Sequence, residues 1–213
     1  MGKKRGSEPP TVPVHTLLDA MSRAWAANPR DAMIIETLAE TGMRNSECRL
    51  LQISDAWNGH DVVLAIKLRP ETAKGGKPRT IPLTSSFRMK LRKWILDNRH
   101  TLNGGMECLP LFPSQQSEGF LTRRGICRII RKYFGAAGSP ATPHYLRHTC
   151  ATELLRVTNA RVVQLMLGHA RLETVQIYTH PTEDDLRGAM NARAAAREKF
   201  VQKNQEIEHK EVN

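Results

Sequence analysis

The amino-acid sequence predicts a mainly helical α+β protein with a small antiparallel sheet on one edge. Apolar side chains recur at helical spacing before residue 52 and again after residue 86, which is typical of amphipathic helices packed on a core. Between these regions, two short segments, 62–66 and 79–83, have the composition of strands. The 213 residues suffice for one well-buried core, or at most for two small domains.

The first helices are delimited by turn residues. Apolar periodicity predicts a helix over 15–27, which ends at Asn28 because a proline follows. Asp31 is placed to cap a second helix, and Gly42 interrupts that helix. Arg44 follows on a turn before a short third helix, so we expect it to project from a helix–turn–helix corner.

The two β-rich segments are expected to pair as an antiparallel hairpin. The intervening sequence at 74–78, KGGKP, has the glycines and the proline of a tight turn. Pro82 lacks an N–H group, and its position therefore suits a strand end or a sheet edge.

The rest of the chain returns to helical periodicity around a loop-like segment at 103–118. Thr142 followed by Pro143 is typical of a helix start, with threonine as the cap and proline in the first turn. Gly168 is expected to close one short helix. The helices predicted here cover 86–95, 126–134, 143–155, 162–167, 174–179 and 183–213.

The charge balance favours a polyanionic partner. Lysine and arginine total 32 against 21 acidic residues, which gives a formal net charge of +11. Nucleic acid is the common partner for such an excess, although a merely soluble basic protein has the same composition. The sequence contains no run of roughly 18 apolar residues and no apolar signal segment, so we expect a cytoplasmic protein without membrane contact. The scattered cysteines are expected to be buried, reduced thiols: Cys48, Cys108, Cys127 and Cys150.

Four motifs supply arginine, histidine and tyrosine side chains suited to phosphodiester chemistry. They are TGMRNSE at 41–47, HYLRH at 144–148, LGH at 167–169 and VQIYTH at 175–180. Arg44 and Arg147 can hold the non-bridging oxygens of a phosphodiester through paired donors and a permanent positive charge. His144 lies three residues before Arg147, so both side chains face one ligand.

Tyr178 is the candidate nucleophile. A phenol has a pKa of about 10, so its ionisation at neutral pH costs roughly 4 kcal/mol, which neighbouring guanidiniums lower. His144 or His148 can take the proton. Lys74, at the tip of the hairpin, has the pKa and reach to protonate the leaving sugar oxygen, and His169 can hydrogen-bond a phosphoryl oxygen. This chemistry requires no metal, ATP or other cofactor.

Each of these residues also has a simpler interpretation. Tyr178 alone fits a half-buried helix tyrosine, and Arg44 alone fits a cap on a neighbouring helix end. His144 and His148 are four residues apart, as in a zinc-binding pair, but no further ligand cluster is visible. Lys74 alone fits a solvated turn lysine.

Two further groups are interpreted as structural. Glu47 is expected to hold an arginine of the site in place without contacting the ligand. The cations of the last helix are expected to form a solvated face: Arg187, Arg193, Arg197 and Lys199.

In their order and spacing, these motifs resemble the catalytic domain of the tyrosine recombinase (phage integrase) family over roughly residues 13–182. The resemblance implies the tyrosine-recombinase catalytic fold, with cleavage by Tyr178 that leaves a 3′-phosphotyrosyl link and a free 5′-hydroxyl. It also implies strand exchange within a homotetramer on two DNA duplexes, through a Holliday junction. The matching segments are TGMRNSEC with Arg44, AKGGKPRTIPL with Lys74, HYLRHTCAT with His144 and Arg147, LGH with His169, and IYTH with Tyr178.

The predicted organisation has three segments. Residues 1–12 form a basic disordered arm and 13–182 a catalytic domain, while 183–213 form a helix and polar tail that, by the resemblance, docks in trans on a neighbouring protomer. Most family members carry a separate helical domain ahead of the catalytic one. Only about a dozen residues precede the match here, which is typical either of an excised catalytic domain or of a short, invertase-like member.

Three functions remain open at this point. The leading hypothesis is a site-specific recombinase for integration, excision or inversion, encoded by a bacterium, a phage or a mobile element. The second is a catalytically idle DNA-binding regulator on the same fold. The third is a relaxing enzyme similar to type IB topoisomerases.

Overall fold

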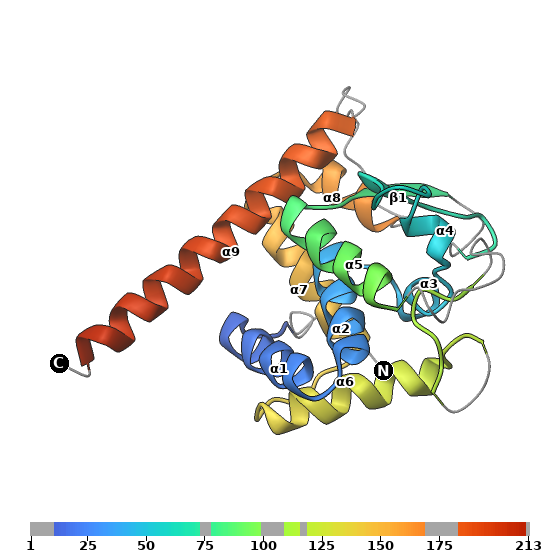
Figure 1. Cartoon of the computed structure of the whole chain (residues 1–213). Coiled ribbons are helices and arrows are strands. Elements are labelled where there is room, and N and C mark those ends of the chain that lie inside the picture. The colour runs from blue at the N-terminus through green and yellow to red at the C-terminus, as the bar shows by residue number, and fades with distance from the viewer. Residues whose placement is uncertain (1–10, 73–77, 99–108, 116–118, 169–182, 212–213) are drawn as a thin grey trace, which may run out of the picture.

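The computed structural model describes residues 11–72, 78–98, 109–115, 119–168 and 183–211. It confirms the mainly helical fold and the small antiparallel sheet (Figure 1). The elements are α1 (Val14–Ala27), α2 (Pro29–Thr41), α3 (Asn45–Cys48), α4 (Ile53–Ala56), β1 (Ala65–Leu68), β2 (Arg79–Pro82), α5 (Ser85–Asp97), α6 (Arg123–Ala136), α7 (Pro143–Leu155), α8 (Ala160–Leu167) and α9 (Glu183–Glu211).

Helix α2 forms the centre of the fold. Nearly all of its residues are buried, because α1, α5, α6 and α7 pack around it. Its two buried threonines are satisfied within the helix, since the Thr37 hydroxyl donates to the Met33 carbonyl at 2.7 Å and the Thr41 hydroxyl donates to the Thr37 carbonyl at 2.5 Å. The C-terminal end of α2 is therefore a fixed point from which the chain turns toward the site.

The helix caps agree with the sequence at three positions and differ at a fourth, and one of the three is Gly168, which ends α8 with φ of 63°. Thr142 caps α7 by accepting from the Tyr145 N–H, and Gly42 ends α2 with φ of 61°. The prediction that Asp31 caps α2 is wrong, because the Asn28 side chain accepts from the N–H groups of Arg30 and Asp31. Asn28 directly precedes the proline that starts the helix, which makes it the N-cap.

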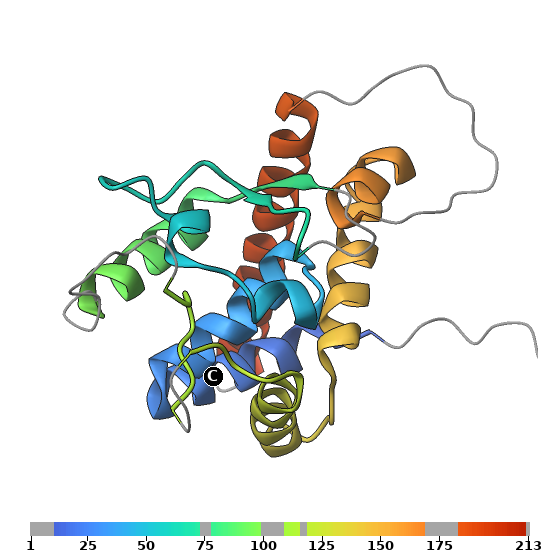
Figure 2. The same ribbon diagram turned by 90° about the vertical axis from the view of Figure 1, so that its right-hand side faces the viewer.

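The hairpin begins later than its β-rich sequence predicts. β1 and β2 pair antiparallel with Ile66 opposite Ile81, and the sheet lies beside α8 (Figure 2). Residues 62–64 lie outside β1. Val62 forms a bridge with Trp57 instead, and the Arg88 guanidinium donates to the carbonyls of Val62 and Val63 at 2.7 and 3.2 Å. The short helix α4 was not expected from the sequence.

Helix α9 packs against the protein by its first half. Arg187 and Lys199 are exposed, as the expected solvated face requires. Arg193, which is 2% exposed, and the half-buried Arg197 contradict it. Both pair with Glu40 and Glu153. The second half runs on past the other helices (Figure 1). The apolar residues that α9 buries against the ends of α7 and α8 are Leu186, Ala189 and Met190.

Several predicted features differ or lie outside the described residues. Val12, predicted to belong to the arm, is buried, and its N–H donates to the Thr149 hydroxyl of α7 at 2.8 Å. Cys48 and Cys150 are buried thiols, whereas Cys127 is half-buried. Among the helices of the described ranges, none is both long and apolar enough to cross a bilayer. Residues 1–10, Cys108 and the helix predicted at 174–179 lie outside those ranges.

Candidate active site

The C-terminal turn of α8 gathers three arginines from distant parts of the chain. Arg79 Nε donates to the Met166 carbonyl at 2.8 Å, Arg147 Nη2 to the Leu167 carbonyl at 2.6 Å, and Arg44 Nη2 to the Gly168 carbonyl at 3.0 Å. The last carbonyls of a helix lack partners within the helix and carry the negative end of its dipole. They therefore attract and orient three guanidiniums at once.

Close contact between α2 and α8 depends on a glycine. Gly42 has the left-handed φ of 61°, and a Cβ at this position would lie 2.6 Å from Leu167 Cδ2. Because no side chain intervenes, Arg147 reaches both helix ends and also donates from Nη1 to the Gly42 carbonyl at 2.7 Å. The TGMR motif thus brings Arg44 beside Arg147.

Glu47 braces two of these arginines with one carboxylate. Arg79 binds it through both terminal nitrogens, at 2.8 and 2.7 Å, and Arg44 Nη1 donates to Oε1 at 2.9 Å. The Arg44 backbone N–H donates to Oε2 at 2.8 Å, so Glu47 also satisfies a backbone donor at the start of α3. The Glu47 side chain is fully buried, so its charge acts at short range on the two guanidiniums.

The site has more positive than negative charge. Burial by itself would raise the pKa of Glu47, but the hydrogen bonds and charges of Arg79 and Arg44 lower it to about 2. Burial, followed by the charges of Arg44 and Arg79, lowers the pKa of Arg147 to about 10. Both groups are thus ionised at neutral pH, and the guanidiniums repel one another around a single carboxylate.

We expect Glu47→Gln to destabilise the fold at neutral pH and to make the free energy of unfolding depend less on pH in the acid range. The folded-state pKa of Glu47 lies below the unfolded value of about 4.3, so ionised Glu47 stabilises the fold above that pH by roughly 3 kcal/mol. This contribution is lost as the pH falls toward 2. Urea unfolding from pH 7 down to pH 3 measures it, with the exposed Glu71→Gln as the control. Parallel stability curves for wild type and Glu47→Gln would contradict the assignment.

An open pocket of about 300 Å³ lies in front of Arg44 and Arg147. Its walls come from the α3 corner, the start of α6 and the start of α7. Seven residues line it: Arg44, Asn45, Ser46, Arg123, Pro143, His144 and Arg147. A phosphodiester entering this pocket meets the two predicted arginines together.

His144 and His148 form a pair beside this pocket. Their Nε2 atoms are 2.8 Å apart, so one imidazole donates to the other. Burial, followed by the neighbouring His144 and Arg147, lowers the pKa of His148. A neutral His148 can hold His144 in one orientation. The described residues contain no group of three or more metal-ligating side chains around this pair.

The described structure brings together one part of the predicted site. Three predicted residues lie outside the described ranges and keep their roles as predictions: Lys74, His169 and Tyr178. Those in the cluster or beside its pocket are Arg44, Glu47, His144, Arg147 and His148.

Sequence reasoning missed Arg79 as a site residue. It was assigned only to a strand, although it follows the KGGKP turn in the same motif as Lys74. All three of its guanidinium nitrogens are engaged by Glu47 and Met166, and its side chain is 7% exposed. Arg79 therefore holds other groups in place and does not line the pocket.

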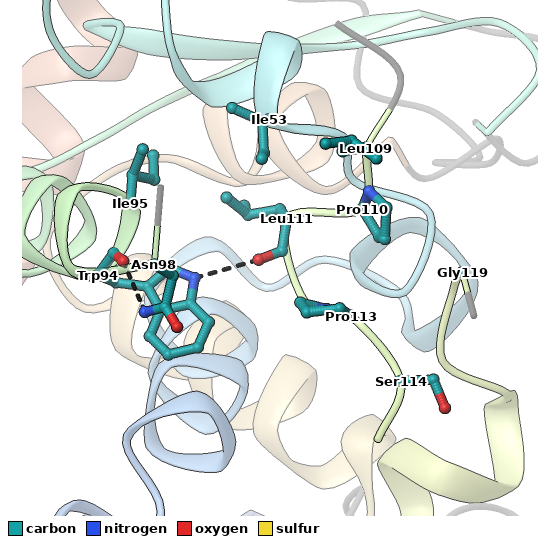
Figure 3. A pocket seen from close by; sticks show the side chains of 10 residues that line it. All are labelled: Ile53, Trp94, Ile95, Asn98, Leu109, Pro110, Leu111, Pro113, Ser114 and Gly119. Atoms are coloured by element: carbon teal, nitrogen blue, oxygen red, sulfur yellow. Dashed lines mark hydrogen bonds between the residues drawn. The ribbon is translucent and has the colours of Figure 1, made fainter. Parts of the chain in front are cut away.

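A larger cavity of about 560 Å³ lies elsewhere, between α5 and the segment before α6 (Figure 3). Trp94 Nε1 donates to the Leu111 carbonyl at its wall, at 3.1 Å. The residues that line it carry no ionisable side chain, so it lacks the charge that phosphodiester chemistry requires. They are Ile53, Trp94, Ile95, Asn98, Leu109, Pro110, Leu111, Pro113, Ser114 and Gly119.

The chain is similar to known proteins in both sequence and fold. The model of the phage integrase family matches residues 13–185. The tyrosine recombinase XerD of Ralstonia nicotianae is 36% identical over 191 residues, which cover 84% of this chain and 60% of that protein. The crystal structure of XerA recombinase superposes with a TM-score of 0.65 at 30% identity, covering 87% of this chain and 63% of that one.

A more distant structure shares the fold alone. A lambda integrase tetramer bound to a Holliday junction has a TM-score of 0.58 at 19% identity, covering 89% of this chain and 51% of that one. The chain thus spans about 60% of the length of the first relatives it matches. Because the family match extends over most of the sequence and includes the arginine motifs, the chain belongs to the phage integrase family of tyrosine recombinases.

Proposed function

We propose that the chain catalyses site-specific DNA recombination, cleaving and rejoining strands through a 3′-phosphotyrosyl intermediate. The observation that carries this proposal is the convergence of Arg44 and Arg147 on one open pocket. That pocket lies next to Gly168, the residue that precedes His169 in the chain. The role could be integration, excision or inversion, since all three use the same reaction.

The electrostatics suit a phosphodiester. Three guanidiniums gather near one carboxylate, which pairs with Arg44 and Arg79, so the cluster carries an excess of positive charge. Burial first, and then the charges of Arg44 and Arg79, lower the pKa of Arg147. A phosphodiester supplies one negative charge, and its five-coordinate transition state supplies more. Arg44 and Arg147 each use two guanidinium nitrogens on the protein, and their remaining N–H groups are available to phosphoryl oxygens.

The proposed proton acceptor and donors are assigned to residues that line the pocket or lie near it in the sequence. His144 lines the pocket, where it can accept the phenol proton, and His148 holds its imidazole. Tyr178 is the proposed nucleophile, and His169 is the proposed donor to a phosphoryl oxygen. Lys74 is the proposed general acid for the leaving sugar oxygen, since it lies five residues before Arg79 on the connection between β1 and β2.

Double-stranded DNA is the proposed partner, and α6 offers a surface for it. The α6 sequence contains no acidic residue, and its first cation lines the pocket. Phosphates flanking the scissile one can therefore follow this helix. The exposed cations are Arg123, Arg124, Arg128, Arg131 and Lys132.

Reversing two of these charges is expected to weaken DNA binding and its salt dependence. For Arg128→Glu with Arg131→Glu, the slope of log affinity against log salt should fall by about 1 for each lost phosphate contact. Fluorescence anisotropy with a labelled duplex at several salt concentrations measures this slope. Arg187→Glu, at an exposed position in the first half of α9, is the matched control. Equal slopes in both variants would remove α6 from the DNA interface.

The proposed assembly is a homo-oligomer on DNA, a tetramer by analogy with the lambda integrase complex. The first half of α9 packs on its own chain, so docking in trans is proposed only for the part beyond Arg197, where Phe200 is 43% exposed. The proposed place of action is the cytoplasm of a bacterial cell.

A pool of nicked duplexes with randomised sequence tests the proposed function. The nick lets the fragment with the free 5′-hydroxyl diffuse away, so cleavage leaves a stable protein–DNA adduct that is detected on a denaturing gel. An idle DNA-binding regulator would bind the duplexes without forming this adduct. A relaxing enzyme would form the adduct but rejoin each cleaved end only to its own strand, whereas a recombinase joins it to another.

A further inference from the structure

A buried arginine of α9 caps the end of α2. Arg193 Nη2 donates to the Ala39 carbonyl at 2.5 Å, and Nη1 donates to the Glu40 carbonyl at 2.7 Å. These carbonyls lie in the last turn of α2, where partners within the helix are missing. Arg193 Nε donates to Glu153 Oε2 of α7 at 2.8 Å. One side chain thus joins three helices while only 2% of it is exposed.

The next turn of α9 repeats the connection. Arg197 binds Glu40 Oε1 and also Glu153 Oε2, the latter at 2.9 Å. Glu40 and Glu153 are therefore bridged by both arginines. We call these four residues the α9 clamp: Glu40, Glu153, Arg193 and Arg197.

The clamp holds the two segments that carry the site arginines. The Glu40 carbonyl lies two residues before Gly42, whose carbonyl receives Arg147, and Arg44 follows two residues later. Glu153 lies on α7, which carries Arg147. The clamp therefore fixes the end of α2 against α7, and the relative position of Arg44 and Arg147 depends on that junction.

A stabilising role alone does not explain why these four positions carry charged side chains. Buried ion pairs are often no more stabilising than apolar residues of similar volume, because the charges lose their hydration. Two buried atoms of the clamp, Glu153 Oε1 and Arg197 Nε, have no hydrogen-bond partner in the described structure. The directed bonds of Arg193 to two backbone carbonyls indicate a geometric role.

We propose that Arg193 is a positioning residue for cleavage, and that it acts by fixing the α2–α7 junction and with it Arg44 and Arg147. This inference rests on the proposed function, because its rate measurement requires DNA cleavage. Arg193 lines no part of the pocket, so it touches neither the DNA nor the reacting atoms. Its loss should slow the chemical step and leave DNA affinity unchanged.

The test compares Arg193→Met with Leu186→Ala in the full chain. Leu186 is a buried apolar residue of the same helix and takes no part in the clamp, so its variant reports a general loosening of α9. Single-turnover cleavage of nicked duplex at saturating protein should slow roughly tenfold to a hundredfold in Arg193→Met, as expected for a small misplacement of catalytic groups. Arg193→Lys should retain more of the rate, because an ammonium can still donate to the α2 carbonyls.

Two further measurements separate positioning from stability. In an Arg147→Ala background, Arg193→Met should slow cleavage less than it does in wild type, because its effect passes through Arg147. Amide hydrogen exchange over residues 38–48 should speed up more in Arg193→Met than in Leu186→Ala, when each variant is measured at the same interval below its own unfolding temperature. The proposal would be overturned if Arg193→Met and Leu186→Ala lost the same factor in cleavage rate when measured at the same interval below their unfolding temperatures. Unchanged hydrogen exchange over residues 38–48 in Arg193→Met would also overturn it.

The experiment also distinguishes this inference from the proposed function. If the wild-type protein forms no adduct with any nicked duplex, the proposed function fails. The hydrogen-exchange comparison of Arg193→Met with Leu186→Ala needs no DNA and still decides whether Arg193 fixes the end of α2. If Arg193→Met does not fold, Arg197→Gln provides the same comparison from the more exposed turn of the clamp.

Discussion

Tyr178→Phe is expected to abolish the covalent protein–DNA adduct while leaving DNA affinity unchanged. The change removes only the phenolic oxygen, which is the atom that would attack the phosphorus. The arginines that hold the phosphate are untouched, so binding measured by fluorescence anisotropy should match wild type. Denaturing gels with nicked duplex should show adduct for wild type alone.

The chain offers matched controls for this experiment, since it contains three tyrosines. Tyr145 lies on α7 and is partly buried, and the hydroxyl of the buried Tyr133 donates to Asp31 at 3.3 Å. Tyr145→Phe and Tyr133→Phe should both keep the adduct. An adduct that survives Tyr178→Phe but disappears in either control would transfer the nucleophile to another phenol.

Arg147→Ala is expected to slow cleavage by about 10²-fold or more, as does the loss of a preorganised donor to a developing oxyanion. The change also leaves the carbonyls of Gly42 and Leu167 without their donor, so the ends of α2 and α8 lose a common partner. Single-turnover cleavage at saturating protein measures the chemical step. Arg147→Lys should also be slow, because an ammonium cannot span both carbonyls and a phosphate in one plane.

A control arginine distinguishes catalysis from general charge. Arg187→Ala removes an exposed cation that pairs with Asp184 on the same helix, and it should cleave at the wild-type rate. A loss of less than about threefold in Arg147→Ala would be far below the effect of an oxyanion donor. Arg147 would then serve only to position the DNA.

The sequence predicts those features that local chemistry determines. The caps at Thr142 and Gly42 follow from residue type, and the structure confirms both. Arg44 and Arg147 can be identified from the sequence because each lies in a short motif, and the motifs follow one another along the chain in the order that the family shows. Glu47 was expected to brace one arginine, and it contacts two.

The features that the sequence did not predict depend on contacts between distant segments. β1 begins late because the chain opposite it enters α5 at Ser85, and Val62 pairs with Trp57 instead. Helix α4 has only four residues, too few to show a period. Arg193 has the spacing of a solvated helix face, and only the acids of α2 and α7 reveal why it is buried.

The arginine cluster is oriented by backbone oxygens as well as by a carboxylate, with four guanidinium bonds to carbonyls and three to Glu47 among the described residues. A peptide carbonyl is a dipole, so it aligns a guanidinium without acting as a full counter-ion. Within the described part of the chain, Arg147 bonds to two such oxygens and to no carboxylate. An anion that binds Arg147 would then have no carboxylate of that part of the chain to displace, and the guanidinium is already oriented for it.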